Sequence, residues 1–247
     1  MPRLISILFI TASFCCLPLA GMPGEDNRIV TGTDMTGSLP LVASGRAATL
    51  CVSPGEWQGV VRALSDLQND LEMVTGVRPV MISSSKAVRS EVIVIAGTIG
   101  RSALIDRLIS KGRIDVTDIR GKWESFLIQT VEKPFPGVKR ALVIAGSDKR
   151  GTIYGIYEIS RQAGISPWYW WADVPARKSS ELYVNPGRYV WGEPSVKYRG
   201  IFLNDEYPAL TRWVAYRYGD VTPSVNPPVP PGVANYGSEF YSRIFEV

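Results

Sequence analysis

Two apolar stretches, Glu91–Gly97 and Ala141–Gly146, restrict the fold of this chain more than any other feature. A strand that faces water on one side alternates apolar and polar residues, whereas a strand covered on both faces is apolar at nearly every position. Each stretch is followed by a turn containing glycine or serine and then by apolar residues at helical spacing. This order predicts a layered α/β or α+β domain over residues 28–190.

The other elements of this domain follow from residue spacing and from the positions of glycine and proline. Residues 28–50 are expected to form an extended lead-in that ends in a strand. Apolar residues at helical spacing predict a helix over 56–75, and Gly76 is its natural stop. Short strands are predicted at 79–83 and 126–131. Helices are predicted after the two apolar stretches, the first before Gly112 and the second with apolar positions at Ile153, Tyr154, Tyr157 and Ile159.

The composition changes after the last of these helices. Three of the seven tryptophans fall within Trp168–Trp171. A new strand is predicted over 196–203, followed by a proline-rich loop at 223–231 and a short helix at 239–247. We interpret residues 195–247 as the beginning of a second domain.

Residues 1–21 have the pattern of a secretory signal. Arg3 supplies the positive n-region, residues 4–19 are apolar, and Ala20 belongs to a small-residue cleavage site. A signal anchor, or a lipidated N-terminus at Cys15 or Cys16, is the alternative. We therefore expect a secreted, extracellular protein with no membrane contact after signal cleavage.

The sequence contains no histidine and, beyond the signal, a single cysteine, Cys51. Ser-His-Asp and Cys-His sites and imidazole metal sites are thereby excluded within this chain, so acid–base chemistry must come from carboxylates, Tyr, Lys or Cys. Cys51 lies in an apolar run and is predicted to be a buried thiol. The net charge of +4 comes without a run of Lys or Arg, so a nucleic-acid partner has no electrostatic support.

Two strand-to-helix turns allow an anion-binding interpretation. Gly97–Ser102 opens a helix, but it lacks a third motif glycine and a Walker lysine, which favours an ordinary tight turn. At the second turn, Asp148 is expected to cap the helix and Gly151 to allow close packing. Lys149 and Arg150 are then either exposed cations or contacts for an anion or another domain.

Two further segments leave two interpretations open. The run Trp168–Trp171 suits either a packed core or a sugar-stacking surface, because Trp and Tyr rings serve both. Asn204, Asp205 and Glu206 follow the predicted strand at 196–203. At the carboxyl end of a barrel strand such residues face an active site, whereas at a helix start they cap the helix.

Three segments resemble the xylan α-1,2-glucuronidases of glycoside hydrolase family 115. These segments are Ala141–Gly155, Ser166–Pro175 and Glu193–Glu206. Members of that family are secreted or periplasmic enzymes that remove glucuronic acid, or its 4-O-methyl form, from xylan side branches with inversion. The resemblance implies an N-terminal α/β domain followed by the first strand, at 196–206, and the first helix, at 239–247, of a (β/α)8 catalytic barrel.

The resemblance also implies roles for individual residues. Asp205 and Glu206 are the candidate catalytic carboxylates of an inverting pair, whose members are separated by about 6.5–9.5 Å. The candidate substrate-binding residues are Asn204, Arg199, Trp170, Trp171, Asp148, Lys149 and Arg150. The three cations among them are candidate partners for a glucuronate carboxylate. No cofactor and no metal are expected, and the expected partner is glucuronoxylan or a glucurono-xylooligosaccharide.

Family members are several times longer than this chain, and further catalytic carboxylates lie on their later barrel strands. One strand cannot close a barrel. We therefore expect a truncated N-terminal fragment that is inactive alone, and homo-oligomers only of the full-length enzyme. A non-catalytic carbohydrate-binding or interaction module is the alternative. An unrelated nucleotide-binding α/β protein is a third hypothesis, which the incomplete glycine motifs disfavour.

Overall fold

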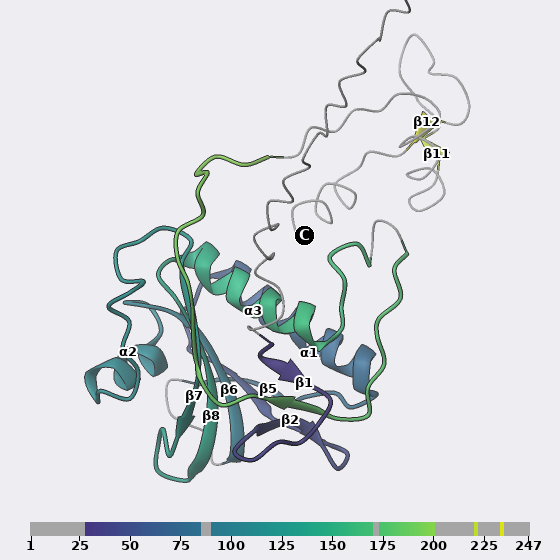
Figure 1. Cartoon of the computed structure of the whole chain (residues 1–247). Helices are drawn as coiled ribbons and strands as arrows, with labels where there is room; N and C mark the ends of the chain where they lie inside the picture. The colour runs from purple at the N-terminus through teal and green to yellow at the C-terminus, as the bar shows by residue number, and fades with distance from the viewer. Residues whose placement is uncertain (1–27, 85–89, 170–172, 201–219, 222–232, 235–247) are drawn as a thin grey trace, which may run out of the picture.

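The computed structural model describes residues 28–84, 90–169, 173–200, 220–221 and 233–234. Its main feature is a six-stranded mixed sheet (Figure 1). In spatial order, the strands are β10 (Arg188–Trp191), β7 (Phe126–Glu132), β8 (Val138–Gly146), β6 (Ser90–Thr98), β4 (Thr49–Val52) and β5 (Met81–Ser83). The four strands from β8 to β5 are parallel, whereas β7 and β10 are antiparallel to their neighbours.

The two apolar stretches form β6 and β8, which pair directly along the parallel part of the sheet. Successive side chains of a strand point to opposite faces, and here both faces are covered. One face packs against α1 (Gln58–Thr75) and α3 (Lys149–Ala163), which lie against each other, and the other against α2 (Ala103–Ser110) and the apolar residues of segment 114–119. The prediction of doubly buried strands in a layered α/β domain is confirmed.

The helices also end where the sequence predicts. α1 stops at Gly76, which adopts a left-handed conformation (φ 76°) and donates its N–H to the carbonyl oxygen of Glu72 at 2.7 Å. Glycine adopts this conformation without the steric cost that a Cβ brings. α2 ends just before Gly112, which also has a positive φ of 62°.

A second, smaller sheet was not predicted. It joins β1 (Val30–Thr31), β9 (Leu182–Val184), β2 (Leu39–Ala43) and β3 (Arg46–Ala47) in that order. The expected lead-in at 28–50 therefore contains β1, β2 and β3 before β4. β9 lies between β1 and β2 and pairs antiparallel with both, so the end of the domain is hydrogen-bonded to its beginning.

The strand predicted over 196–203 is not present in its described part. Residues 196–200 have no strand conformation, and no strand in the described part of the chain lies beside them to pair their backbone. The remainder of that strand, the proline-rich loop and the helix at 239–247 fall outside the described residues, apart from the short pair β11 (Asp220–Val221) and β12 (Val233–Ala234). Across the described ranges, none of the helices has the length and apolarity needed to cross a bilayer.

Candidate functional site

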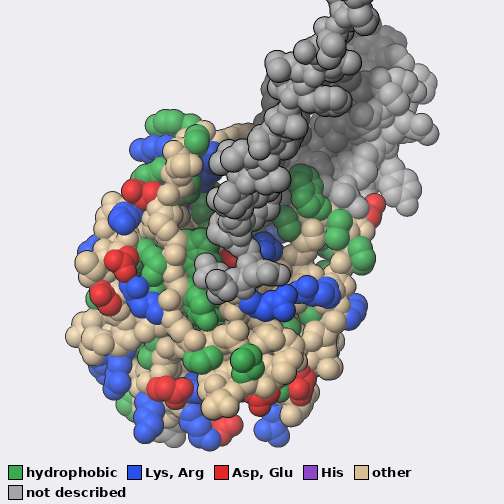
Figure 2. All heavy atoms as spheres, in the orientation of Figure 1, with side chains coloured by type: hydrophobic (Ala, Val, Ile, Leu, Met, Phe, Trp, Pro, Cys, Tyr) green, Lys and Arg blue, Asp and Glu red, His purple; other side chains and the backbone are tan. Residues whose placement is uncertain are grey.

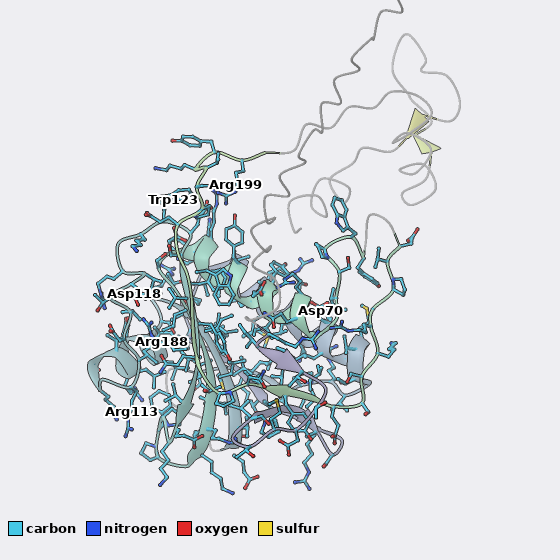
Figure 3. All side chains as sticks on the ribbon, viewed as in Figure 1. Asp70, Arg113, Asp118, Trp123, Arg188 and Arg199 are labelled. Carbon is cyan, nitrogen blue, oxygen red and sulfur yellow. The ribbon has the colours of Figure 1, made fainter. Side chains whose placement is uncertain are left out.

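Four of the predicted site residues lie close together at the carboxyl end of the parallel strands. A cavity of about 330 Å³ opens there, and the Arg199 side chain lies beside it, near Trp123 (Figure 3). The cavity is lined by Trp123, Glu124, Asp148, Lys149, Arg150, Lys197 and Tyr198. The other five predicted site residues, Trp170, Trp171, Asn204, Asp205 and Glu206, lie outside the described residues.

Asp148 caps the N-terminus of α3, as predicted. One carboxylate oxygen, Oδ1, accepts the N–H of Gly151 at 2.8 Å, and the other, Oδ2, accepts the N–H of Glu124 at 2.8 Å. Both oxygens are therefore engaged by backbone donors. Asp148 joins the start of α3 to the loop before β7, and this contact gives it a structural role.

Gly151 allows the close packing that the sequence predicts. A Cβ at this position would lie 2.2 Å from the carbonyl oxygen of Ser125. Gly146, the last residue of β8, allows a second close approach, because a Cβ there would lie 2.2 Å from the backbone nitrogen of Thr152 in α3. The loop before β7 can thus approach the first turn of α3 closely, and this approach brings Glu124 to the cavity.

Glu124 is a site residue that the sequence did not reveal, as are Trp123, Lys197 and Tyr198 in the cavity lining. The Glu124 side chain is only 5% exposed, and its backbone has a positive φ of 51°. The carboxylate accepts a hydrogen bond from Arg150 Nη1 at 2.9 Å and a second from Arg199 Nη2. Arg199 also reaches the hydroxyl of Tyr154 at 3.4 Å. Two of the three cations predicted to meet a glucuronate carboxylate are thus already paired with a protein carboxylate.

The charges around Glu124 favour its ionised form. Burial raises the pKa of Glu124, but the hydrogen bonds and positive charges of Arg150 and Arg199 together outweigh burial and hold the pKa below its ordinary value. In turn, the carboxylate raises the pKa of both guanidinium groups. The three groups therefore remain charged at neutral pH.

Lys149 differs from the two arginines. Within the part of the chain that the structure describes, no carboxylate forms an ion pair with it. Its Nζ lies 5.8 Å from the ring centroid of Trp57, and the guanidinium of Arg101 lies 3.8 Å from the same ring. Trp57 is 41% exposed, so an aromatic ring and two cations share one surface beside the cavity.

The turn at Gly97–Ser102 is closed from within, which agrees with the tight-turn interpretation. Glu56 is 4% exposed, and its Oε2 accepts the N–H of Thr98 at 2.9 Å. The hydroxyl of Ser53 accepts the N–H of Leu104 at 3.2 Å, in the first turn of α2. Side chains of the protein thus occupy donors that a phosphate would use, so this turn gives nucleotide binding no support.

The remaining observations concern the Cys51 thiol, possible metal ligands and the charges on the surface. Cys51 is buried, and burial raises the pKa of its thiol to about 11, so it is a core thiol as predicted. Among the described residues, no group of three or more His, Cys, Asp and Glu side chains is placed to hold a metal ion. Acidic and basic side chains are interspersed over the lower part of the face in Figure 2.

Comparison with known proteins identifies the family. A model of glycosyl hydrolase family 115 matches residues 191–247. The solved structure of BtGH115A, a family 115 4-O-methyl-α-glucuronidase with specificity for decorated arabinogalactans, matches with a TM-score of 0.63 and 35% sequence identity, over 83% of this chain. The chain belongs to glycosyl hydrolase family 115. A second structure, that of CpGH84D, has a TM-score of 0.35 and 9% identity over 56% of this chain and 20% of its own, too weak a likeness to support an argument. No curated protein matches the sequence.

The family 115 chain spans 24% of the length of BtGH115A. Its match to the family model starts at the last residue of β10 and includes Glu193 and Arg199. Both residues bond back to the loop before β7, because the Glu193 carboxylate accepts the N–H of Trp123 at 3.1 Å and Arg199 pairs with Glu124. The cavity therefore lies where the layered domain meets the segment that matches the family model.

Proposed function

We propose that this chain is the N-terminal portion of an exported glycoside hydrolase that removes glucuronic acid, or its 4-O-methyl form, from polysaccharide side branches with inversion. The observation that carries the proposal is the 35% identity to a 4-O-methyl-α-glucuronidase over 83% of the chain. Family membership supports glycoside hydrolysis, and the relative supports the uronic acid as the sugar that is released.

The next question is which polysaccharide carries the uronic acid that the enzyme removes. The resemblance of the sequence to xylan α-1,2-glucuronidases favours glucuronoxylan, whereas BtGH115A has specificity for decorated arabinogalactans. Both polymers present a terminal uronic acid, so the shared chemistry is a carboxylate-bearing sugar. Release of glucuronic acid by the longer enzyme, of which we propose this chain to be the N-terminal portion, should be measured on each polymer in parallel. Preference for the xylan supports our substrate, and equal inactivity on both contradicts the proposal.

The proposed mechanism uses two carboxylates on opposite sides of the glycosidic bond, with a water molecule activated by one of them. We assign one of the pair to Asp205 or Glu206, because these two residues match the family's Asn-Asp-Glu block. In the longer enzyme, Asp205→Asn or Glu206→Gln should lower kcat by about 10³-fold or more. Full activity of both variants would refute the assignment.

The layered domain offers Lys149 as the cation for the uronate carboxylate. Arg150 and Arg199 already pair with Glu124, whereas Lys149 lines the cavity without a carboxylate partner among the described residues. Lys149→Gln should raise KM for the charged substrate and leave KM for its methyl ester unchanged. Lys178→Gln is the matched control, since Lys178 contacts the carbonyl oxygen of Met73 away from this cavity.

We also propose that the 247 residues alone do not hydrolyse these polymers. The chain spans 24% of the length of BtGH115A, and an inverting site requires two carboxylates held around the sugar. The purified chain should release no glucuronic acid, and its activity would contradict this proposal. The reading frame downstream of Val247 gives an independent test, because further strand–helix units there would support the longer enzyme.

A non-catalytic carbohydrate-binding module is the second candidate. The observation that favours it is the number of exposed aromatic side chains, including Trp57, Trp168, Tyr169 and Tyr198. Exposed rings suit stacking on the C–H faces of sugars. Retardation of the chain in a gel containing glucuronoxylan, lost in Trp57→Ala and Trp168→Ala, would support this function, and unretarded migration would count against it.

A further inference from the structure

The contact between the layered domain and the segment after β10 is centred on one buried carboxylate, that of Glu124. Glu124 is nearly inaccessible, whereas the two arginines that reach it are 65% exposed for Arg150 and 40% exposed for Arg199. A single carboxylate thus receives one arginine from α3 and another from the segment at 192–200. Trp123 and Arg199 lie close together at this point (Figure 3).

Contacts other than the one with Arg199 also hold Glu124 in place. Its backbone N–H is donated to Asp148, which also caps α3, and the neighbouring Ser125 N–H is donated to the hydroxyl of Ser147 at 3.0 Å. Arg150 alone provides a counter-charge for the carboxylate. The pairing with Arg199 is therefore not required to stabilise Glu124, and its effect falls on the segment that carries Arg199.

We propose that Glu124 is a positioning residue whose carboxylate holds Arg199, and thereby fixes where the chain leaves the layered domain. The described part of this segment, 192–200, has no ladder of backbone hydrogen bonds to hold it. Side-chain contacts take that place, namely the Glu124 pair with Arg199, the weaker contact of Arg199 with the Tyr154 hydroxyl at 3.4 Å, and the bond from the Trp123 N–H to Glu193.

The consequence for catalysis rests on the proposed function. Asp205 is the sixth residue after Arg199, and a chain spans at most about 3.5 Å per residue, so at most about 21 Å of extended chain separates the two. Anchoring Arg199 limits the volume that the proposed catalytic block can occupy. Catalytic geometry is sensitive to displacements of about 1 Å, so a residue that restricts where this segment can lie would contribute to the rate without touching the substrate.

Limited trypsin digestion of the 247-residue chain tests the proposal directly, because Lys197 and Arg199 are cleavage sites within the held segment. In Arg199→Gln, cleavage after Lys197 should become about three- to tenfold faster, as expected for loss of a partly exposed ion pair. Glu124→Gln should accelerate cleavage after Lys197 similarly. Arg199→Lys, which keeps the charge but loses the planar fork, should give an intermediate rate.

Global stability separates positioning from a merely structural role. Arg199→Gln leaves the pair of Glu124 with Arg150 intact, so the Tm should stay unchanged while local cleavage accelerates. Glu91→Gln is the control for loss of an ion pair elsewhere, since it breaks the exposed pair of Glu91 with Lys139. Unchanged cleavage after Lys197 in Arg199→Gln would overturn the proposal, even if Glu124→Gln fails to fold. None of these outcomes depends on glycosidase activity. The positioning role of Glu124 and the proposed function can therefore be refuted independently of each other.

Discussion

Replacement of Asp70 by asparagine should stabilise the domain at neutral pH. Asp70 lies on α1, near Ser160 of α3 and one turn after Asp66. Burial raises the pKa of Asp70 from 3.8 to about 6, contact with the Ser160 hydroxyl opposes this in part, and the negative charge of Asp66 raises it further. The ionised carboxylate is thus less stable in the folded than in the unfolded protein.

The magnitude follows from the difference between the two pKa values. Each pKa unit corresponds to about 1.4 kcal/mol, so the difference of about 2 units is worth about 3 kcal/mol. Between pH 3.8 and about 6, the folded state holds a proton that the unfolded state has lost. The contribution of Asp70 to the free energy of unfolding therefore falls as the pH rises through this window, and above it the full cost remains.

Urea unfolding followed by tryptophan fluorescence measures this effect. At pH 7.5, Asp70→Asn should raise the free energy of unfolding by about 1–3 kcal/mol, and below pH 3.8 the gain should vanish. Asp118→Asn is the matched control, because Asp118 is exposed and paired with Arg188 (Figure 3), so its loss should cost about 1 kcal/mol or less. An Asp70→Asn variant that is no more stable at pH 7.5, or equally more stable at both pH values, would refute this reasoning.

Three further predictions concern the described residues. Gly151→Ala should lower the free energy of unfolding by about 1–3 kcal/mol, measured by urea titration, because its Cβ would lie 2.2 Å from the Ser125 carbonyl oxygen; a neutral effect would contradict the close approach. Cys51 should resist labelling by a maleimide at pH 8 until urea unfolds the domain, since burial raises the pKa of its thiol to about 11; rapid labelling of the folded chain would contradict its burial. Glu124→Gln should destabilise the domain near pH 7, and this effect should shrink as the pH falls below 4.5, because the arginines hold the pKa of Glu124 below its ordinary value and this contribution is lost as the pH falls through the folded-state pKa; a destabilisation in thermal melts that does not change with pH would contradict that pairing.

The sequence predicted the elements whose signals are local. β6 and β8 are apolar throughout because both faces are covered, and α1 ends at the glycine that its C-terminus requires. The cap by Asp148 was also predictable, since the acceptor and the donor of Gly151 are three residues apart. Each of these signals depends on residues within one or two turns of each other.

The smaller sheet and Glu124 depend on contacts between distant residues, and a single sequence contains no local sign of them. β1 has only two residues, too few for a recognisable alternation, and its partner β9 lies about 150 residues further along the chain. Glu124 is 75 residues from Arg199 and lies in a loop without periodicity. The sequence shows the charges of Arg150 and Arg199, but not that an internal carboxylate already neutralises them in part.

The pairing of β9 between β1 and β2 has a consequence for the order in which the domain is made. Asn185 donates its backbone N–H to the carbonyl oxygen of Ile29 at 2.8 Å and its side-chain amide to that of Arg28, so these two carbonyl oxygens receive their donors only after nearly 160 further residues have been synthesised. β10, at the edge of the main sheet, comes later still. On a ribosome, the parallel strands and their helices can assemble first, whereas the smaller sheet must wait for residue 184. Nascent chains arrested before and after that point should therefore differ sharply in protease resistance.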